Sequence, residues 1–341
     1  MVNNNPLRGW QVDRRTIRTI GHDLQRPECI LAEADGTLWS ADARGGVMRI
    51  RPDGSQQLVA QQEDKRFAQS SEADKFILRG TLPNGLAFAR NGDILIANFG
   101  TNAIERMTRG GHSRTLYTQI DGIALGKVNF VLRDSKDRIW VTIHTRLEPW
   151  TRCVQEKTAD GYIALIDARG IRIVADGFLG TNEIRMDARE EWLYVVESNA
   201  RRISRLRVGT DGCLSDREVF GPRDLGGIPD GFAFDAFGNL WVTLVMYDRL
   251  IALTPEAEVL TLLDDGDVVK NAEIDRHFAA GTITPEMMLA TRGTLAPWMA
   301  SVTFGGPDLR TVYIGSLMGT TIPYFRSPVA GLPMVHWKET V

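Results

Sequence analysis

Short apolar runs that alternate with polar residues recur along the whole chain. The stretches "ECILAEADGTLW", from Glu28, and "DGFAFDAFGNLW", from Asp230, each hold a polar residue, an apolar run, a turn and a second run ending in tryptophan. Alternation with a period of two is typical of β-strands, and turn residues between two such runs indicate a hairpin. The pattern therefore predicts a protein built from antiparallel hairpins.

Four further copies of this pattern share its register and begin at Asn84, Asn129, Asn182 and Ser301. Successive copies start 56, 45, 53, 48 and 71 residues apart, which is close to the length of a four-stranded propeller blade. We therefore predict an all-β fold, a six-bladed β-propeller that forms a single domain over residues 1–341. An open solenoid is the competing geometry, but it requires capping repeats at its ends, and we recognise none in the sequence.

Two stretches are longer than the blades require. Residues 56–81 are polar and are expected to form a long loop or an extra strand of the first blade. Residues 258–298 contain a short helical insertion between the fifth and sixth repeats, with Thr284 as its N-cap, Pro285 in its first turn and Gly293 as its terminator. A helix that packs on the disc is favoured over a lid that covers it.

Composition and charge narrow the class of protein. The chain has 43% hydrophobic and 24% charged residues and a net charge of -3, so it lacks the basic field that attracts nucleic acid. Neither a secretory signal nor an apolar run of about 18 residues is recognised, so a cytoplasmic protein without a membrane partner is expected. The three cysteines are widely spaced and indicate neither a disulfide framework nor a zinc site.

The first residues of the six copies provide the candidate chemistry. Equivalent positions on the innermost strands of a propeller surround one mouth of its channel, and here they are all oxygen-bearing, with two carboxylates and three amides. Such a ring suits a hard divalent cation, most readily Ca²⁺, with Mg²⁺, Mn²⁺ and Zn²⁺ left open. The alternative is that these residues cap strands or hold channel water. The ring consists of Glu28, Asn84, Asn129, Asn182, Asp230 and Ser301.

Three phrases carry a family resemblance. The segments "FVLRDSKDRIWVT" (130–142), "PDGFAFDAFGNLWVT" (229–243) and "SVTFGGPDLRTVYIGSL" (301–317) resemble the family of gluconolactonases, regucalcin (senescence marker protein) and luciferin-regenerating enzymes. The resemblance implies a six-bladed propeller with a divalent metal, usually Ca²⁺, in its channel and a hydrolase acting on lactones or related esters. The metal ligands of that family fall on Glu28, Asn129, Asn182 and Asp230.

The sequence also departs from the family pattern. Cys29 and Glu183 stand where glycines are usual, and Lys127 replaces an arginine of the sugar lactonases. These changes affect a sugar substrate more than they affect metal binding. We expect Cys29, beside a metal ligand, to influence substrate preference.

In the mechanism that the resemblance implies, metal-activated water attacks the substrate in the channel. Asp230 is assigned as the base, and Glu28 chiefly as a ligand. Loops at the same mouth, about four places after the second strand's register position, are expected to bring in Asp42, Asn98, His144, Glu197, Tyr247 and Ser316. The residues predicted to bind substrate are Lys127, His144, Asn84, Arg146 and Glu183.

Two other functions stay open. The propeller could be a protein-interaction scaffold whose ion is purely structural, or a diverged enzyme of the same fold with different chemistry. The lead hypothesis has a small-molecule substrate as its partner, and the oligomeric state is left open.

Overall fold

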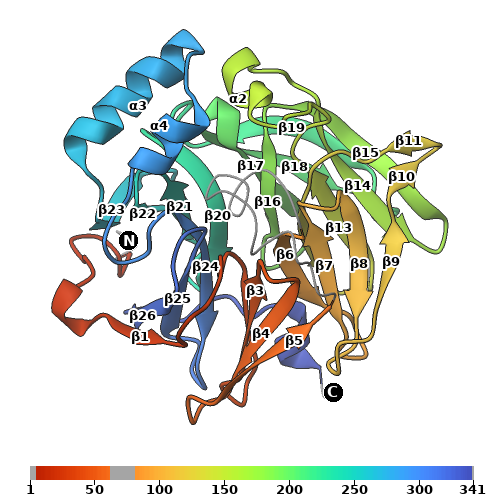
Figure 1. Ribbon diagram of the computed structural model, residues 1–341, viewed down its shortest axis with the longest axis horizontal. Coiled ribbons are helices and arrows are strands. Elements are labelled where there is room, and N and C mark those ends of the chain that lie inside the picture. Colours follow the sequence, from red (N-terminus) through yellow and green to blue (C-terminus); the bar gives the residue numbers. More distant parts are fainter. Residues whose placement is uncertain (1–4, 62–80, 340–341) are drawn as a thin grey trace.

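Six antiparallel sheets are arranged around a central axis (Figure 1). The computed structural model describes residues 5–61 and 81–339. Each sheet has four strands, so the predicted all-β, six-bladed β-propeller is confirmed. The expected loop or extra strand in 56–81 is in part β5 (Gln56–Ala60), the outer strand of the first blade, and residues 62–80 lie outside the described residues.

The blades follow one another along the chain, and each begins with its innermost strand. The first blade contains β2 (Ile30–Ala32), β3 (Leu38–Asp42), β4 (Gly46–Ile50) and β5. The second contains β6 (Pro83–Phe88), β7 (Ile94–Asn98), β8 (Ala103–Met107) and β9 (Ser113–Tyr117). The third contains β12 (Val128–Arg133), β13 (Ile139–Ile143), β14 (Gly161–Asp167) and β15 (Gly170–Phe178). The fourth contains β16 (Thr181–Met186), β17 (Trp192–Glu197), β18 (Arg202–Val208) and β19 (Leu214–Phe220). The fifth contains β20 (Ile228–Phe234), β21 (Leu240–Val245), β22 (Arg249–Leu253) and β23 (Val259–Asp264). A small hairpin of β10 (Gln119–Ile120) and β11 (Ile123–Ala124) precedes the third blade.

The sixth blade joins the two ends of the chain. It contains β24 (Met299–Gly305), β25 (Thr311–Ser316) and β26 (Ile322–Arg326), and its outer strand is β1 (Arg18–Ile20). Strand β1 pairs antiparallel with β26. This pairing closes the disc, so the first and last repeats need no caps. The three-residue β1 carries no periodicity, which is why the repeat pattern did not predict it.

The tryptophans of the repeat are structural. Trp39, Trp140 and Trp241 lie on the second strands of their blades and are almost fully buried. Each indole N–H donates to a carboxylate six residues earlier, as in Trp140 to Asp134 (2.9 Å) and Trp241 to Asp235 (2.9 Å). A buried indole N–H without an acceptor would be costly, so the hairpin acid and the tryptophan belong together.

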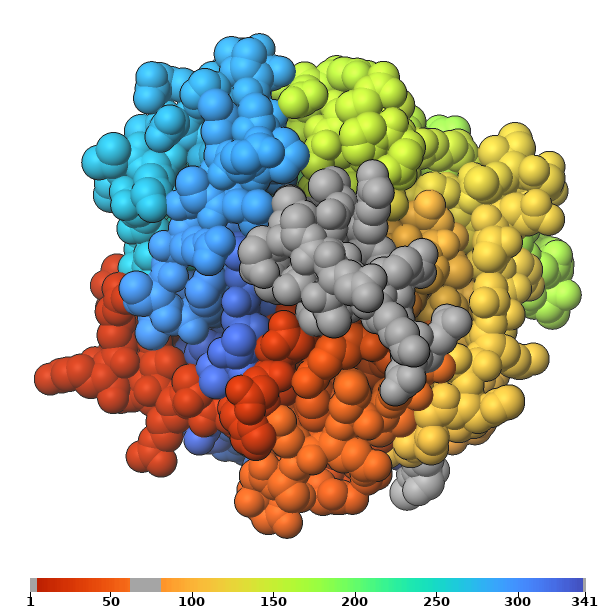
Figure 2. Space-filling view, in the orientation of Figure 1, coloured from red at the N-terminus to blue at the C-terminus, as the bar shows by residue number. Residues whose placement is uncertain are grey.

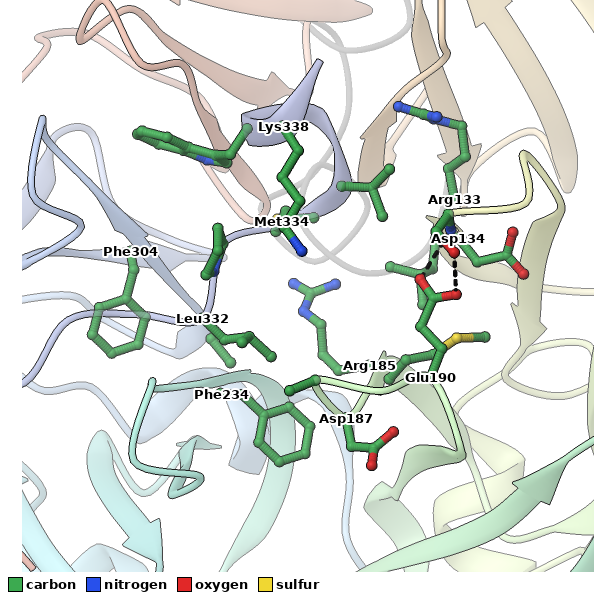
Figure 3. Close-up of a pocket in the computed structure, with 18 of the residues that line it drawn as sticks. Arg133, Asp134, Arg185, Asp187, Glu190, Phe234, Phe304, Leu332, Met334 and Lys338 are labelled. Carbon is green, nitrogen blue, oxygen red and sulfur yellow. Dashed lines mark hydrogen bonds between the residues drawn. The ribbon is translucent and has the colours of Figure 1, made fainter.

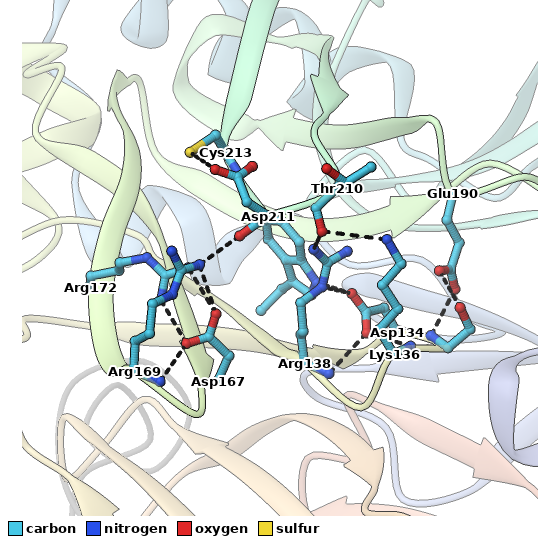
Figure 4. A network of polar contacts seen from close by, with 12 residues as sticks. Asp134, Lys136, Arg138, Asp167, Arg169, Arg172, Glu190, Thr210, Asp211 and Cys213 are labelled. Atoms are coloured by element: carbon cyan, nitrogen blue, oxygen red, sulfur yellow. Dashed lines mark hydrogen bonds and ion pairs between the residues drawn. The ribbon is translucent and has the colours of Figure 1, made fainter.

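Polar contacts also tie the hairpin turns of neighbouring blades. Figure 4 shows one such network between the third and fourth blades. Arg138 binds Asp134 and donates to the Thr210 carbonyl (3.4 Å), and Arg169 binds Asp167 and donates to the Asp211 carbonyl (2.6 Å). These contacts hold the 209–213 turn of the fourth blade against the third.

Three helices lie on one face of the disc, namely α2 (Arg152–Glu156), α3 (Val268–Ala280) and α4 (Pro285–Ala290). The predicted helix after Thr284 is confirmed as α4, and Thr284 accepts a hydrogen bond from the Met287 amide (3.3 Å). The helix ends at Ala290 with Thr291 as its C-cap, before the predicted terminator Gly293. The longer α3, whose N-cap is Asp267, was not predicted. Short 3-10 turns occur at η1 (Arg14–Thr16), η3 (Ser198–Ala200) and η4 (Val335–Lys338). Within residues 5–61 and 81–339, no helix combines the length and apolarity that crossing a membrane requires.

The insertion that carries α3 and α4 rises over the same face as the segment around α2. In the space-filling view, the two form adjacent blue and yellow-green ridges (Figure 2). Met288 of α4 is buried and belongs to the apolar core beneath, together with Trp150 and Cys153 from the α2 segment. The insertion is therefore packed onto the disc, as the sequence favoured.

Candidate active site in the channel

The starts of the inner strands meet at one cavity of about 70 Å³. Five of the six ring residues line it: Glu28, Asn84, Asn129, Asn182 and Asp230. The sixth, Ser301, instead donates its hydroxyl to the Glu28 backbone carbonyl. The register of the repeats therefore brought five side chains to one place, although their positions span more than 200 residues of sequence.

Bulges lie near the starts of five inner strands, and Asn84, Asn129, Asn182 and Asp230 stand within them. The pairing register shifts between Pro83 and Leu86 in β6, and the same irregularity occurs in β12, β16, β20 and β24. A β-bulge changes the direction of a side chain and leaves a backbone group without its ladder partner. In β12 and β20 a threonine of the next strand replaces that partner: the Phe130 amide donates to Thr142 (3.0 Å), and the Gly231 amide donates to Thr243 (3.1 Å).

Close packing at the bulges explains the glycine that follows two ring residues. A Cβ at Gly85 would lie 2.5 Å from the Phe130 ring, and one at Gly231 would lie 2.4 Å from the Ala300 carbonyl. Each glycine lets the inner strands of adjacent blades approach where the ring is narrowest. The "NG" and "DG" of the repeat therefore have a structural cause.

Hydrogen bonds orient the amides of the ring. The Asn84 side-chain nitrogen donates to Glu28 Oε1 (3.2 Å) and to the Asn129 carbonyl (3.0 Å). The Asn182 nitrogen donates to Asp230 Oδ1 and to the Ser198 hydroxyl (3.0 Å). Because the Asn182 nitrogen is held within the ring, its amide oxygen is left for another partner.

Three buried oxygens of the ring have no hydrogen-bond partner among the described residues. They are Glu28 Oε2, Asn129 Oδ1 and Asn182 Oδ1. A buried acceptor without a donor is costly, and a hard cation satisfies carboxylate and amide oxygens together. Within the described chain no three His, Cys, Asp or Glu side chains are grouped to hold a metal, so a cation here would also need the amide oxygens. This donor set is typical of Ca²⁺ and lacks the nitrogen and sulfur ligands that Zn²⁺ prefers.

Arg26 also lines the cavity, and the sequence did not predict it. Its guanidinium is buried and donates to Asn84 Oδ1 (2.5 Å) and to the Pro83 carbonyl (3.1 Å). Burial lowers the pKa of Arg26, and the charges of Glu28 and Asp230 oppose this shift. The repeat pattern begins at Glu28, so a side chain two places earlier fell outside the comparison that produced the ring.

Burial dominates the electrostatics of the carboxylates. It raises the pKa of Glu28 well above its ordinary value, with Arg26 opposing this shift, and it raises the pKa of Asp230, with Glu183 adding repulsion. Glu183 lies behind the ring, where burial raises its own pKa to about 7 although Arg185 is 3.0 Å away. The protein thus concentrates acidic groups where a cation would relieve their repulsion.

His144 lines the cavity from the end of β13. It is packed edge-on against Phe99 and Trp150, with ring centroids 6.2 and 5.6 Å apart. Neither ring nitrogen reaches hydrogen-bond geometry with a described group, and burial lowers the pKa of His144 to about 4. His144 is therefore a neutral imidazole at neutral pH, and its ring lies near the Thr181 backbone.

A second and larger cavity, about 290 Å³, lies at the other ends of the inner strands (Figure 3). The C-terminal segment, including Leu332 and Met334, forms part of its wall. Its charged groups are largely paired: Arg133 with Glu339 (2.9 Å), and Glu190 with the Ser135 amide (2.9 Å). Because most of its charged groups already have partners, this end is a weaker candidate for chemistry.

Comparison with known proteins decides the family. The model of the SMP-30/Gluconolactonase/LRE-like region matches residues 27–274, which is more than half of the chain. The protein belongs to this family. The matched stretch begins beside Glu28 and includes the whole predicted ligand set.

Relatives and solved structures agree with this assignment. The chain is 27% identical to the 6-deoxy-6-sulfogluconolactonase of Pseudomonas putida over 180 residues, which are 50% of this chain and 52% of the relative. The match thus spans about half the length of that relative. The fold of the present chain is similar to that of a Xanthomonas campestris gluconolactonase (TM-score 0.65, 19% identity, 92% and 89% of the two chains). It is also similar to the calcium-binding regucalcin of Agrobacterium tumefaciens (TM-score 0.62, 14% identity, 92% and 95%).

Three of the predicted substrate contacts lie outside the lining of the channel cavity. Lys127 is buried beneath it, with its ammonium 3.5 Å from Glu148 and over the Phe99 ring. Arg146 is exposed and lies over the Tyr162 ring. Glu183 accepts from the Phe232 amide (3.3 Å) behind the ring. Asn84 lines the cavity, but its amide is committed to Glu28 and Arg26.

Cys29, which we expected to influence substrate preference, does not line the channel cavity. Its buried sulfur accepts a hydrogen bond from the Leu86 amide (3.3 Å) and packs between the first two blades. Of the six loop positions expected at the mouth, His144 is the one found among the described lining residues. Asn98 shows why the others differ, since its side chain caps the Leu82 amide (3.1 Å) of the neighbouring strand.

Proposed function

We propose that this family member is a divalent-metal-dependent hydrolase of a lactone or a related small ester. The observation that carries the proposal is the set of three buried ring oxygens that have no hydrogen-bond partner among the described residues. Two of these oxygens belong to asparagines: hydrogen bonds hold Asn182 in place, and Asn129 stands in a β-bulge. Membership of a family that includes gluconolactonases supports the reaction class.

The proposed ligands of the cation are Glu28, Asn129, Asn182 and Asp230, with Ca²⁺ the first candidate because all four offer oxygen. A bound divalent cation supplies polarisation of a carbonyl and a lowered pKa for water. The calcium-binding regucalcin of similar fold is consistent with this assignment.

Asp230 is the proposed base. Asn182 holds its Oδ1 by a hydrogen bond, and a carboxylate beside a bound water can accept a proton from it. In the reaction, the oxygen of water bonds to the acyl carbon and one proton passes to Asp230. The acyl C–O bond then breaks, and the departing alkoxide takes up a proton, so the product is a hydroxy acid.

Two further residues support this chemistry in the proposal. The Arg26 guanidinium lies among Glu28, Asn84 and Asp230 and is placed to stabilise negative charge that develops on the acyl oxygen. Neutral His144 is placed to hydrogen-bond the substrate through a nitrogen that lacks a described partner. The substrate contacts proposed from the sequence therefore narrow to His144, with Asn84 as an orienting residue.

The test is hydrolysis of a lactone panel by protein freed of metal with a chelator and then supplied with Ca²⁺, Mg²⁺, Mn²⁺ or Zn²⁺. Hydrolysis should require the cation, and Asp230→Asn should lower kcat/KM by about 100-fold or more. Glu339→Gln, a matched change at the other end of the strands, should leave the rate within about twofold of wild type.

Activity that ignores chelation and survives Asp230→Asn would overturn the mechanism. A protein that binds the cation yet hydrolyses no member of the panel would favour the scaffold with a structural ion. Calorimetric titration with each cation separates these two results.

A further inference from the structure

The channel cavity has two chemically different parts. The ring forms an oxygen-rich floor, and half of the lining, nine of the eighteen described residues, is apolar. These nine form a collar, for which Phe99, Trp150, Val154, Met246, Met288 and Trp298 are representative. The floor is built from inner strands, whereas much of the collar comes from the α2 and α4 segments and from residues flanking strands.

The collar is fixed by its own packing. Phe99 and Trp150 are in edge-on contact with ring centroids 5.5 Å apart. The Trp298 indole N–H donates to the Thr291 carbonyl (2.8 Å), so its polar atom is used within the protein. Met288 is 2% exposed and belongs to the core cluster beneath α4. A ligand above the ring would therefore meet carbon surfaces that are already in place.

Polar groups beside the collar are mostly committed. The Ser198 hydroxyl donates to the Pro229 carbonyl (2.7 Å), and the Asn199 amide nitrogen donates to Cys153 Sγ (3.1 Å). The His144 nitrogens remain without partners among the described residues. Few hydrogen bonds to a substrate are available beside the collar, whereas several hydroxyls would lose water without replacement.

Size adds a second restriction. The cavity of about 70 Å³ is far below the few hundred Å³ usual for drug-sized ligands. A small ring with a short substituent suits this space better than a six-carbon polyol does.

We propose that the substrate is a small five- or six-membered lactone with an alkyl substituent and few or no free hydroxyls, rather than a sugar lactone. The inference rests on the proposed lactone hydrolysis and adds the class of substrate. The acyl group lies over the ring, the alkyl group lies in the collar, and His144 binds one lactone oxygen.

The experiment compares two six-membered lactones, δ-hexalactone and glucono-1,5-lactone, with metal-loaded full-length protein. After subtraction of spontaneous hydrolysis, kcat/KM should favour δ-hexalactone by about 100-fold or more, since hydroxyls buried without partners are rejected. Met288→Gln, which adds an amide to the collar, should reduce this ratio by about 10-fold.

Two further variants separate an effect of the collar from a general effect on the core. Val154→Thr adds a hydroxyl to the collar at nearly constant volume and should also reduce the ratio. Val195→Thr makes the same change in the buried core, at a residue that does not line the cavity, and should leave the ratio unchanged. Thermal melts confirm that all variants are folded.

Equal or better hydrolysis of glucono-1,5-lactone overturns the inference, as does an equal change of the ratio in Val154→Thr and Val195→Thr. Metal-dependent hydrolysis with a preference for the sugar lactone would leave the proposed function standing. Absence of metal-dependent hydrolysis for both lactones would overturn the proposed function and this inference with it.

Discussion

The two ends of the inner strands differ in how their polar atoms are satisfied. At the starts of the strands, oxygens of Glu28, Asn129 and Asn182 are buried without a described partner. At the other ends, Arg133 donates to Glu339, to Asp137 and to the Phe88 carbonyl (2.7 Å). The second cavity is the larger of the two, yet most of its charged side chains are paired within the protein. Buried polar atoms that lack hydrogen-bond partners, rather than the volume of the cavity, therefore mark the candidate active site.

The histidines near the two ends repeat the contrast. His336, close to the second cavity, hydrogen-bonds the Ala32 carbonyl (2.8 Å), whereas the His144 nitrogens are buried without such a bond to a described residue. Both imidazoles have a lowered pKa because of burial. The shift is thus common to both ends, and the missing partner is what distinguishes His144.

Removing one carboxylate charge at each end tests whether the two ends differ in cation binding. Glu28→Gln keeps the oxygen that Asn84 binds but loses the charge, so affinity for Ca²⁺ should fall by about 100-fold or more, measured by calorimetric titration. Glu190→Gln, at the second cavity, should leave that affinity unchanged. Equal losses in the two variants would show that the ends do not differ in the way proposed.

The loss of folding stability at acid pH should depend on His144. Its pKa of about 4 in the folded protein, against 6.5 for the free residue, means that folding disfavours its protonated form. The stability that this shift contributes is fully present above pH 6.5 and is lost as the pH falls from 6.5 to 4, by about 3 kcal/mol.

His144→Phe should flatten this part of the stability curve, measured by urea unfolding at each pH. Surface His22→Asn is the control and should leave the curve as in wild type. An unchanged acid limb in His144→Phe would contradict the assignment of the shift to this residue.

Cation binding should stabilise the folded protein through the channel end. At a free Ca²⁺ concentration of 100 times Kd, the free energy of unfolding should rise by about 2.7 kcal/mol over the chelated protein. Differential scanning calorimetry should show the higher Tm in wild type and in Glu190→Gln, but not in Glu28→Gln. A Tm that rises equally in all three would place the stabilising ion elsewhere.

The smallest effect is expected at the second cavity. Glu339→Gln removes one partner of Arg133, which keeps its contacts to Asp137 and to the Phe88 carbonyl. The free energy of unfolding should fall by about 1 kcal/mol or less, since partly exposed pairs contribute little. Chemical denaturation measures this, and a loss of several kcal/mol would show that the C-terminal segment is a main support of the fold.

Much of the fold could be predicted from the chain because its repeat is local. Each copy carries its own hairpin, and three of the six carry a tryptophan with the acid that binds its indole, so the number of blades follows from counting. The helix after Thr284 was equally local, since its cap and its proline are adjacent. Helix α3 was missed because a cap at Asp267 precedes a helix with no clear apolar stripe.

The candidate site was predictable as far as register alone decides it. Equivalent positions in a propeller meet at one mouth, and this brought Glu28, Asn129, Asn182 and Asp230 to one cavity. Register cannot say which way a side chain turns. Cys29 and Glu183, each next to a ring residue, face away from the cavity into interblade packing or the buried channel behind the ring.

By itself, then, the sequence determined six blades and an oxygen-rich ring, because periodicity is written into neighbouring residues. The tertiary structure alone decided the bulges at the ring residues, the closure of the disc by β1, the arrival of Arg26 and the apolar collar from α2 and α4. These features depend on contacts between residues far apart in the chain, and such contacts leave no period in the sequence.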